Sequence, residues 1–312
     1  MDKTLKLSVS PHIHSGKSTA GIMRDVIIAL LPTTVAGVII FGLRSIAVIA
    51  ACVLSSVAFE AIFNYICKKD QTVGDLSAAV TGLLLALNLP ANIPLWQCVI
   101  GSMFAIIIVK CLFGGIGCNA VNPAITARVF MLVAFSSLTH QAMPKVVDTV
   151  SGATPLSMEA GAAAPSLFEL FIGLKGGAIG EVCGAALLLG FIYLLFRRVI
   201  TWHIPLSFVG CVFLISLIIE GGDWAKSLSF VLSGGLLIGA IFMATDYVTS
   251  PATPKGKLIF GVGAGIITVL IRYYGVYPEG VSFGILFMNI LTPYIDVWTK
   301  HRVFGSGGRT NE

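Results

Sequence analysis

Apolar runs of roughly 17 to 22 residues recur between residues 26 and 298 of this 312-residue chain. An apolar α-helix needs about 20 residues to cross a bilayer, and fewer where it is broken or buried in a bundle. Charged residues make up only 11% of the sequence, against about a quarter in soluble domains. The sequence therefore predicts an all-α polytopic membrane protein, because the apolar runs are too abundant for a soluble core.

We expect about ten transmembrane helices, arranged as two inverted five-helix repeats. The spans are predicted at residues 26–42, 45–66, 74–90, 95–112, 121–138, 178–195, 203–219, 227–244, 258–274 and 281–298. The third, fifth and tenth carry Asp75, Arg128 and Asp296, so they should face protein rather than lipid. The predicted organisation is a tail at 1–21, a first repeat at 22–138, a loop at 139–177, a second repeat at 178–298 and a tail at 299–312.

Short matches that occur in the same order in both halves support the repeat. Gly101–Val109 resembles Gly261–Val269, and Phe130-Met131 resembles Phe287-Met288. A duplicated half with five spans must insert in the opposite orientation, because five is an odd number. Chance matching of Gly and Leu, which are common in membrane helices, is the alternative.

The distribution of Lys and Arg predicts the orientation in the membrane. With ten spans and a cytoplasmic N-terminus, fourteen basic residues fall on the cytoplasmic side and five on the outer side. Both termini are therefore expected in the cytoplasm, with the loop 139–177 on the outer face. The first 21 residues are polar, so no cleavable signal peptide is expected.

That outer loop contains a polar stretch, Asp148 to Thr154, with the pattern Asp-x-x-Ser-Gly-Ala-Thr. The pattern resembles the flavinylation sequence on which a flavin transferase attaches FMN through its phosphate. Thr154 is the predicted attachment point, because a hydroxyl can carry a phosphoester. The other candidate residues are Asp148 for recognition by the transferase, and Ser151, Gly152 and Ala153 for a turn whose N–H groups face the phosphate. An ordinary surface turn is the alternative.

Two further polar segments, residues 114–124 and 245–251, follow apolar spans in the two halves. Irregular backbone at membrane depth is tolerated only where it is buried in protein or lines a cavity. Intramembrane ionisable groups are themselves hypotheses for functional sites. The candidate residues for an ion path or a second flavin site are Asn119, Asn122, Asp246, Thr249, Arg128 and Asp75. Ordinary turns at helix ends are the alternative.

Several other site classes are not expected. Residues 15–19 resemble the end of a phosphate-binding loop, but Pro11 stands where that motif requires glycine. The seven cysteines form no C-x-x-C pair, and no Cys/His cluster has metal-ligand spacing. The net charge of +5 comes without a basic stripe, so nucleic acid is not an expected partner. We predict no metal site and no catalytic side chain.

Taken together, the loop motif, the ten spans, Gly-Gly-x-Gly-x-Asn-x-x-Asn-Pro-Ala at 114–124 and Thr-Asp-x-x-Thr-Ser-Pro at 245–251 resemble one known family. It contains the D subunit of the Rnf complex, an ion-translocating ferredoxin:NAD oxidoreductase, and the B subunit of the sodium-pumping NADH:quinone oxidoreductase. The resemblance covers nearly the whole length. The B subunit has a longer N-terminal extension, so the Rnf branch is the better match.

The resemblance implies a multi-pass translocase subunit of the bacterial cytoplasmic (inner) membrane that is not catalytic alone. It implies FMN esterified to Thr154, a second, non-covalent flavin (riboflavin) near the cytoplasmic face, and electron transfer coupled to sodium or proton transport. The implied partners are a flavin-bearing subunit on the outer face, iron–sulfur membrane subunits, cytoplasmic NAD- and ferredoxin-facing subunits, and the flavin transferase. The alternatives are a ten-helix channel or secondary transporter without a redox cofactor, and a structural scaffold for neighbouring redox subunits.

Overall fold

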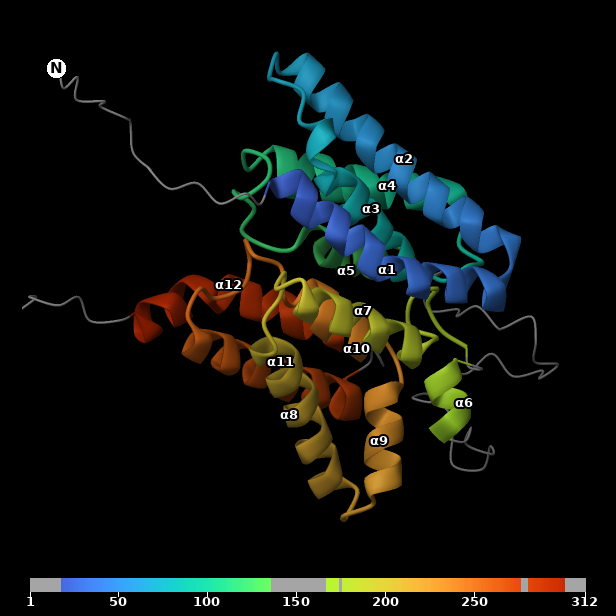
Figure 1. The fold of residues 1–312 in the computed structure, drawn as a ribbon, viewed down its shortest axis with the longest axis vertical. Helices are drawn as coiled ribbons and strands as arrows, with labels where there is room; N and C mark the ends of the chain where they lie inside the picture. The colour runs from blue at the N-terminus through green and yellow to red at the C-terminus, as the bar shows by residue number, and fades with distance from the viewer. Residues whose placement is uncertain (1–17, 136–166, 174–175, 276–279, 301–312) are drawn as a thin grey trace, which may run out of the picture.

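The computed structural model describes residues 18–135, 167–173, 176–275 and 280–300, which are predominantly helical (Figure 1). The elements of the first half are α1 (Thr19–Phe41), α2 (Leu43–Ile66), η1 (Val73–Asp75), α3 (Ser77–Leu87), α4 (Leu95–Met103), η2 (Phe104–Cys111) and α5 (Pro123–Ala134). Those of the second half are α6 (Leu167–Ile172), α7 (Gly184–Phe196), α8 (His203–Ile219), α9 (Trp224–Leu232), α10 (Leu236–Ile238), η4 (Gly239–Met243), α11 (Pro254–Tyr274) and α12 (Val281–Thr299).

Capping residues in the sequence set several of these boundaries. The Ser18 hydroxyl accepts the Gly21 N–H and begins α1, and the Thr253 hydroxyl accepts the Gly256 N–H and begins α11. Gly42 adopts φ 81°, a conformation that glycine tolerates, and it separates α1 from α2 without an intervening loop. The long apolar stretch from residue 19 to residue 66 therefore folds as two helices rather than one.

The predicted all-α membrane architecture is found, but the structure does not establish ten spans. Within the described ranges, α1, α2, α11 and α12 are long and apolar enough to cross a membrane. The pair formed by α9 and α10–η4 would add a fifth span, but it is bent by 67°. The remaining apolar helices of 10–17 residues are α3, α4–η2, α5, α7 and α8.

Three predicted segments differ from the structure because the chain breaks at polar or glycine-rich sites. The span expected at 178–195 begins as helix only at Gly184, and its first residues are irregular. The span expected at 227–244 is interrupted after α9, where Gly234 has φ 66°. The span expected at 74–90 is α-helical only over the 11 residues of α3, which the short 3₁₀ helix η1 precedes.

Two expected boundaries also shift. Helix α1 begins at Thr19, inside the segment predicted as an N-terminal tail, because Ser18 supplies the cap. The predicted outer loop at 139–177 contains α6 near its end. Residues 139–166 of that loop, including Asp148, Ser151, Gly152, Ala153 and Thr154, lie outside the described residues.

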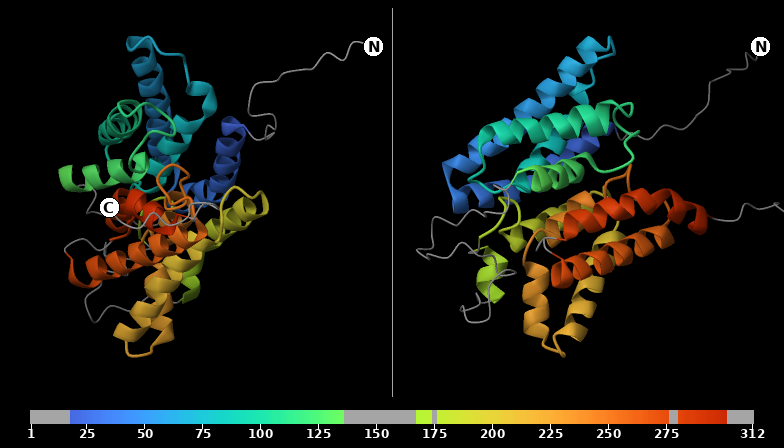
Figure 2. Two further views of the ribbon diagram at one scale, coloured as in Figure 1. Left: turned by 90° about the vertical axis from the view of Figure 1, so that its left-hand side faces the viewer. Right: turned by 180° about the vertical axis from the view of Figure 1, so that it is seen from behind.

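The helices of the first half gather on one side of the molecule and those of the second half on the other (Figures 1 and 2). Helix α1 packs against α7 at this boundary, and α5 packs against α12. Gly190 of α7 allows α1 and α7 to approach closely, because a Cβ there would collide with the carbonyl oxygen of Ala29 and the ring of Phe242. Close approach through small residues is a common way for membrane helices to associate.

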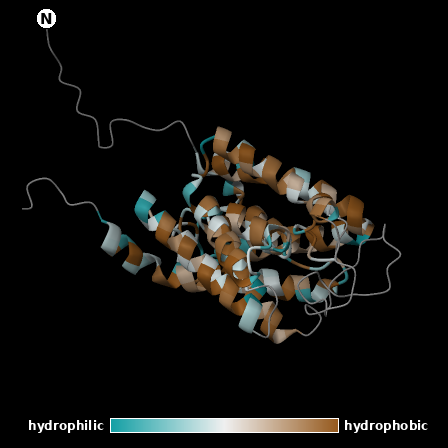
Figure 3. Ribbon diagram, turned by 90° about the horizontal axis from the view of Figure 1, so that it is seen from below, coloured by the Kyte–Doolittle hydropathy of each residue, from teal (hydrophilic) through white to brown (hydrophobic). Residues whose placement is uncertain are grey.

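Apolar residues dominate the helices on their outer faces as well as inside (Figure 3). Ile39 is 70% exposed, Leu54 69% and Val297 73%, on three different helices. Apolar exposure on this scale marks a membrane or partner surface rather than a water-facing one. The internal core contains fully buried Leu85 and Phe208, one from each half.

The α1–α7 contact generates a stability prediction. Gly190→Ala should destabilise the protein by roughly 1–3 kcal/mol, because the added methyl group overlaps Ala29 and Phe242. The matched control is Gly210→Ala in α8, where nothing lies within 4 Å of an added Cβ. Thermal unfolding of the detergent-solubilised protein should show a lower midpoint for the first variant only. Equal midpoints would contradict the packing described here.

Candidate functional site

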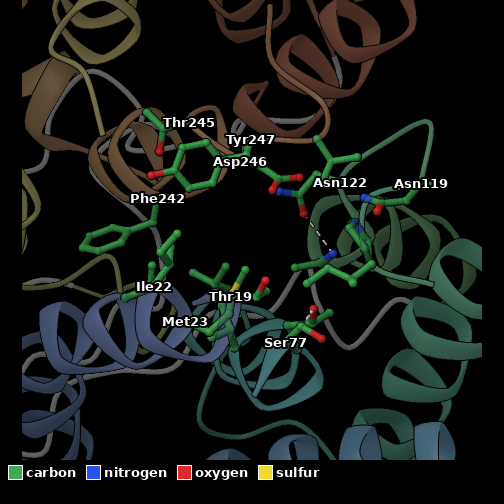
Figure 4. Close-up of a pocket in the computed structure, with 18 of the residues that line it drawn as sticks. Thr19, Ile22, Met23, Ser77, Asn119, Asn122, Phe242, Thr245, Asp246 and Tyr247 are labelled. Carbon is green, nitrogen blue, oxygen red and sulfur yellow. Dashed lines mark hydrogen bonds between the residues drawn. The ribbon is translucent and has the colours of Figure 1, made fainter. Parts of the chain in front are cut away.

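A cavity of about 420 Å³ lies where α1, α3 and α5 meet α7 and the segment that follows η4 (Figure 4). Its walls are mainly apolar, with Ile22 and Met23 from α1, Val80 from α3 and Phe242 from η4. The main polar side chains that line it are Ser77, Lys110, Asn119, Asn122, Thr245 and Asp246. A concave, largely apolar site with a few convergent polar groups is the usual form of a small-molecule pocket.

Asn122 fixes one wall of the cavity. Its side-chain oxygen caps α5 by accepting the N–H groups of Ala124 and Ile125 at 3.0 and 3.3 Å. Its amide nitrogen donates to the carbonyl of Met243, the last residue of η4, at 3.1 Å. Both ends of the side chain are therefore used, and they tie the start of a helix in one half to the end of a helix in the other.

Asn289 of α12 forms hydrogen bonds to both polar segments. With its amide oriented to satisfy both neighbours, its nitrogen donates to the Thr249 carbonyl and its oxygen accepts the Asn122 backbone N–H, both at 3.2 Å. Thr292, one turn further along α12, also donates to the Thr249 carbonyl at 2.9 Å. The two segments predicted from sequence are therefore adjacent, and a residue of a third segment connects them.

Asp246 presents a carboxylate to the cavity. It is partly exposed there, and the Thr249 hydroxyl donates to its Oδ2 at 3.1 Å. Desolvation raises the pKa of Asp246, while the hydrogen bonds from Thr249 and from the backbone of Val248 and Tyr247 act in the opposite direction. Figure 4 shows Asp246 and Tyr247 across the cavity from Met23 and Ser77. The carboxylate is thus available to a donor group on a ligand.

A buried ion pair lies at the edge of the same cavity. Lys110 Nζ is 2.7 Å from Glu60 Oε1, and the two side chains are only 3% and 2% exposed. Lys110 also donates to the hydroxyl of Ser77. Glu60 Oε2 has no hydrogen-bond partner in the described part of the chain. Because an unpaired buried charge is costly, each side chain compensates the charge of the other.

Polar contacts continue from this pair away from the cavity. Thr72 donates to Glu60 Oε1 at 2.9 Å and accepts from Asn64 at 3.0 Å. On the other side of Lys110, the Ser77 hydroxyl donates to Asp75. The side chains form a continuous hydrogen-bonded chain between the cavity and the loop that joins α2 to α3.

The structure separates the predicted site residues into two groups. Asn119, Asn122 and Asp246 line the cavity, and the Thr249 hydroxyl donates a hydrogen bond to Asp246. Asp75 and Arg128 do not line it: Asp75 accepts the Ser77 N–H at 2.8 Å near the start of α3, and Arg128 is buried in α5. The predicted residues therefore divide between the cavity and the hydrogen-bonded chain that contains Asp75, and Arg128 does not line the cavity.

Sequence reasoning missed the Glu60–Lys110 pair and the bridging role of Asn289. In the sequence, Lys110 stands at the end of an apolar run and contributes only to the topology prediction. Fifty positions separate it from Glu60. A lysine and a glutamate placed in apolar segments are a usable signal, because both are rare there without partners. Nothing in the local sequence around Asn289 distinguishes it from other polar residues in membrane helices.

The cavity suits a flat, amphipathic ligand. Its apolar walls can cover a ring system, while Asp246 accepts hydrogen bonds and Lys110 adds a cation to the lining. Asn119 also lines the cavity, and its amide nitrogen donates to the Val121 carbonyl at 3.2 Å. Among the residues described, no three His, Cys, Asp or Glu side chains come together as a metal site.

Comparison with known proteins relates the whole of this region to one family. The sequence profile of the NQR2, RnfD, RnfE family matches residues 6–305, which include every residue that lines the cavity. The chain is 48% identical to the D subunit of the Na(+)-translocating ferredoxin:NAD(+) oxidoreductase complex of Acetobacterium woodii, over 96% of this chain and 95% of that protein.

More distant relatives match over similar lengths. The D subunit of the proton-translocating ferredoxin:NAD(+) oxidoreductase complex of Clostridium ljungdahlii is 38% identical, with 96% of each chain covered. The D subunit of the ion-translocating oxidoreductase complex of Citrobacter koseri is 33% identical, with 96% of this chain and 99% of that protein covered. The similarity therefore extends over both polar segments and the loop between the two halves.

The buried ion pair generates a prediction for a double-mutant cycle. Lys110→Met should destabilise the protein by roughly 3–5 kcal/mol, because it leaves the Glu60 carboxylate buried without a cation. Adding Glu60→Gln should recover part of this loss. The control pair is Lys226 and Asp223, 3.6 Å apart with side chains 67% and 41% exposed, where Lys226→Met should change stability by less than about 1 kcal/mol. Thermal unfolding in detergent measures Lys110→Met, Glu60→Gln, the double variant and Lys226→Met, and additive effects at Lys110 and Glu60 would contradict direct pairing.

Proposed function

The chain belongs to the NQR2, RnfD, RnfE family, and on this premise we propose that it is the D subunit of an ion-translocating ferredoxin:NAD oxidoreductase complex in the bacterial cytoplasmic membrane. The observation that carries the proposal is the 48% identity to the D subunit from Acetobacterium woodii over nearly the full length of both chains. The described residues contain no group of metal ligands, so iron–sulfur centres would have to come from other subunits. The chain is thus a translocase subunit that carries electrons and does not complete the reaction alone.

One flavin is proposed to be FMN, joined through its phosphate to the hydroxyl of Thr154 by a flavin transferase. The support is the pattern of Asp148, Ser151, Gly152, Ala153 and Thr154, together with the family membership. Thr154 acts as an attachment point formed once, not as a nucleophile in each turnover. The fixed tether keeps the flavin within reach of a neighbouring redox subunit on the outer face.

A second, non-covalent flavin such as riboflavin is proposed to occupy the cavity between the two halves. The cavity volume, about 420 Å³, lies within the usual range of ligand pockets, roughly 300–1,000 Å³. Its hydrogen-bonding groups also fit a flavin: Asp246 accepts from a ring N–H, while Asn119 and Lys110 contact polar atoms of the ring or side chain. When bound, the flavin supplies the redox chemistry, and the protein supplies its orientation and local charge.

The residues around this site exclude water and fix the ligand position. Phe242 and Leu84 come from different halves and provide apolar walls. Asp246 is held by Thr249, which in turn is fixed by α12, so its carboxylate does not swing freely. Lys110 is neutralised by Glu60, which keeps the local charge balanced near an uncharged ring.

We further propose ten spans in two inverted repeats, with both termini in the cytoplasm. Similar contacts occur in the two halves, although the glycine of the second half lies two positions after Gly261, the residue that the sequence comparison matches with Gly101. A Cβ on Gly101 of α4 would meet Met131 of α5, and a Cβ on Gly263 of α11 would meet Met288 of α12. In each half, the fourth predicted span packs on the fifth through a glycine and a methionine. The cavity then lies near the cytoplasmic face, and the Thr154 loop lies outside.

The coupling ion is sodium or a proton, and both occur in the names of relatives of this chain. The hydrogen-bonded chain from Asp75 through Lys110 and Glu60 to Asn64 is the proposed polar path in this subunit. A channel or transporter without a redox cofactor is the alternative. The broken helices fit either function, but the flavin-attachment motif favours the redox subunit.

The covalent flavin gives the first functional prediction. Thr154→Ala in the complex should abolish the flavin fluorescence that stays with this subunit after denaturing electrophoresis, because no phosphoester can form. Thr149→Ala, at an unspecified position of the same motif, is the matched control and should leave the fluorescence unchanged. Intact mass of the subunit checks both results. Fluorescence retained in Thr154→Ala would contradict the assignment of Thr154 as the site of flavin attachment.

The cavity gives a separate prediction. Asp246→Ala should weaken retention of the extractable flavin about ten- to a hundredfold, since a hydrogen bond to a charged group contributes about 1.5–3 kcal/mol. Asp296→Ala is the control, because Asp296 accepts the Ala252 N–H at 3.0 Å and does not line the cavity. Chromatography of flavin released by acid from the dialysed complex measures the effect. Equal flavin content in both variants would exclude this site while leaving the Thr154 assignment intact.

A further inference from the structure

We infer that the cytoplasmic ends of α1 and α7 form a binding site for an anionic phospholipid, with the lipid phosphate at Arg24, Arg197 and Arg198. A second cavity, also about 420 Å³, is lined by these three arginines together with Ser18, Gly21 and Asp25. Three cations and one carboxylate give its wall a net charge of +2. Nothing in the flavin or ion-path proposals uses these arginines.

Only one of the three arginines is paired within the described ranges. Arg197 contacts Asp25 through its Nε and Nη2 atoms, at 3.2 Å to Oδ2 from each. Tyr193 also donates to Asp25, at 3.2 Å. Arg24 and Arg198 have no ion pair in the part of the chain that the structure describes, and both are exposed. The Asp25–Arg197 pair therefore builds the cavity, and two guanidinium groups are left for a ligand.

The backbone conformation of Arg198 is a second indication that a cation is required at this position. Arg198 follows the end of α7 and adopts φ 55°, a left-handed conformation that glycine usually occupies at this position. Its N–H donates to the Leu195 carbonyl at 3.0 Å, and the next N–H, of Val199, donates to the Leu194 carbonyl at 2.9 Å. The helix end would thus be formed more easily with glycine, yet the chain places an arginine there.

The cavity lies at the end of an exposed apolar surface. On α1, Arg24 is followed at helical spacing by exposed Ile28, Leu31 and Val35, which share its face. On α7, exposed Leu189, Ile192 and Phe196 lead toward Arg197. The two helices pack side by side, and Ala29 meets Gly190 between these rows (Figure 1).

The two apolar rows lie on the same flank of the helix pair. Val26 of α1 and Leu194 of α7 line the flavin cavity on the opposite flank. Helical geometry at 100° per residue puts Ile28 and Leu189 away from that cavity. A lipid bound there would place acyl chains along α1 and α7 and its head group in the basic cavity.

The chemistry of the site favours an anionic lipid over a neutral one. Arginine pairs with phosphate through parallel N–H donors, and basic pockets between membrane helices on the cytoplasmic side bind anionic head groups. Trp202, 50% exposed and four residues after Arg198, is placed as an interfacial aromatic would be. A free phosphate would use the arginines but not the apolar surface.

The test measures lipids that remain with the purified complex. Phosphatidylglycerol and cardiolipin would be quantified by mass spectrometry after detergent washing, for the wild type and for Arg24→Gln/Arg198→Gln. The expected result is at least a threefold loss of anionic lipid in the variant, with phosphatidylethanolamine unchanged. The charge-matched control is Lys255→Gln/Lys300→Gln, which removes two exposed cations on α11 and at the end of α12 and should not change lipid content.

A second variant separates lipid binding from folding. Arg198→Gly removes one cation at a position where glycine suits the backbone, so thermal stability without added lipid should be maintained or raised. Its anionic lipid content should still fall. Added phosphatidylglycerol should raise the melting temperature of the delipidated wild-type complex more than that of Arg198→Gly.

Three outcomes would overturn the proposal. The first is anionic lipid content that is equal in the wild type and both arginine variants. The second is an equal rise in melting temperature from inorganic phosphate alone, which would identify a free anion. The third is loss of extractable flavin from the arginine variants with retained lipid, which would identify a flavin phosphate as the occupant. That outcome is possible because the basic cavity shares Ile22, Val199 and Tyr247 with the proposed flavin cavity.

Discussion

A backbone N–H or C=O group that enters a bilayer needs a partner inside the protein, and this constraint shapes the centre of the molecule. Helices α3, α5 and η4 end or begin there, and their terminal groups cannot be solvated by lipid. Asn122 solves the problem at one junction by capping α5 and donating to Met243. At a second junction, the N–H groups of Ile179 and Gly180 donate to the carbonyls of Leu89 and Leu87.

These same breaks create the functional site. Continuous helices would fill the interface between the two halves with side chains, whereas helix ends leave a cavity with polar groups on its wall. Asp246 is held by Thr249, which α12 fixes, and Asn119 is held by the Val121 carbonyl, so these two polar groups are already positioned for a ligand. The basic cavity shares Ile22, Val199 and Tyr247 with it. A lipid at the arginines would therefore contact the helix ends that close the proposed flavin site.

The sequence alone determined the all-helical membrane class, because apolar residues in runs of this length have no other stable fold. It also identified the two polar segments around Asn119 and Asp246 and the family, because these are local patterns that do not depend on the fold. The attachment residue Thr154 stays a prediction from sequence, since it lies outside the described residues. The sequence could not predict the lengths of α3 and α9. These lengths depend on which groups elsewhere in the fold satisfy the backbone N–H and C=O groups where each helix breaks.

Only the tertiary structure decided which polar residues meet. Lys110 pairs with Glu60 across 50 positions, and Asn289 reaches both polar segments from the last helix. Asp75 and Arg128 follow from the same sequence argument as Asp246, yet neither lines the cavity. Helical periodicity says which face a residue occupies but not which helix lies opposite. The opposite helix is set by packing between segments far apart in the chain, and such contacts have no local signature.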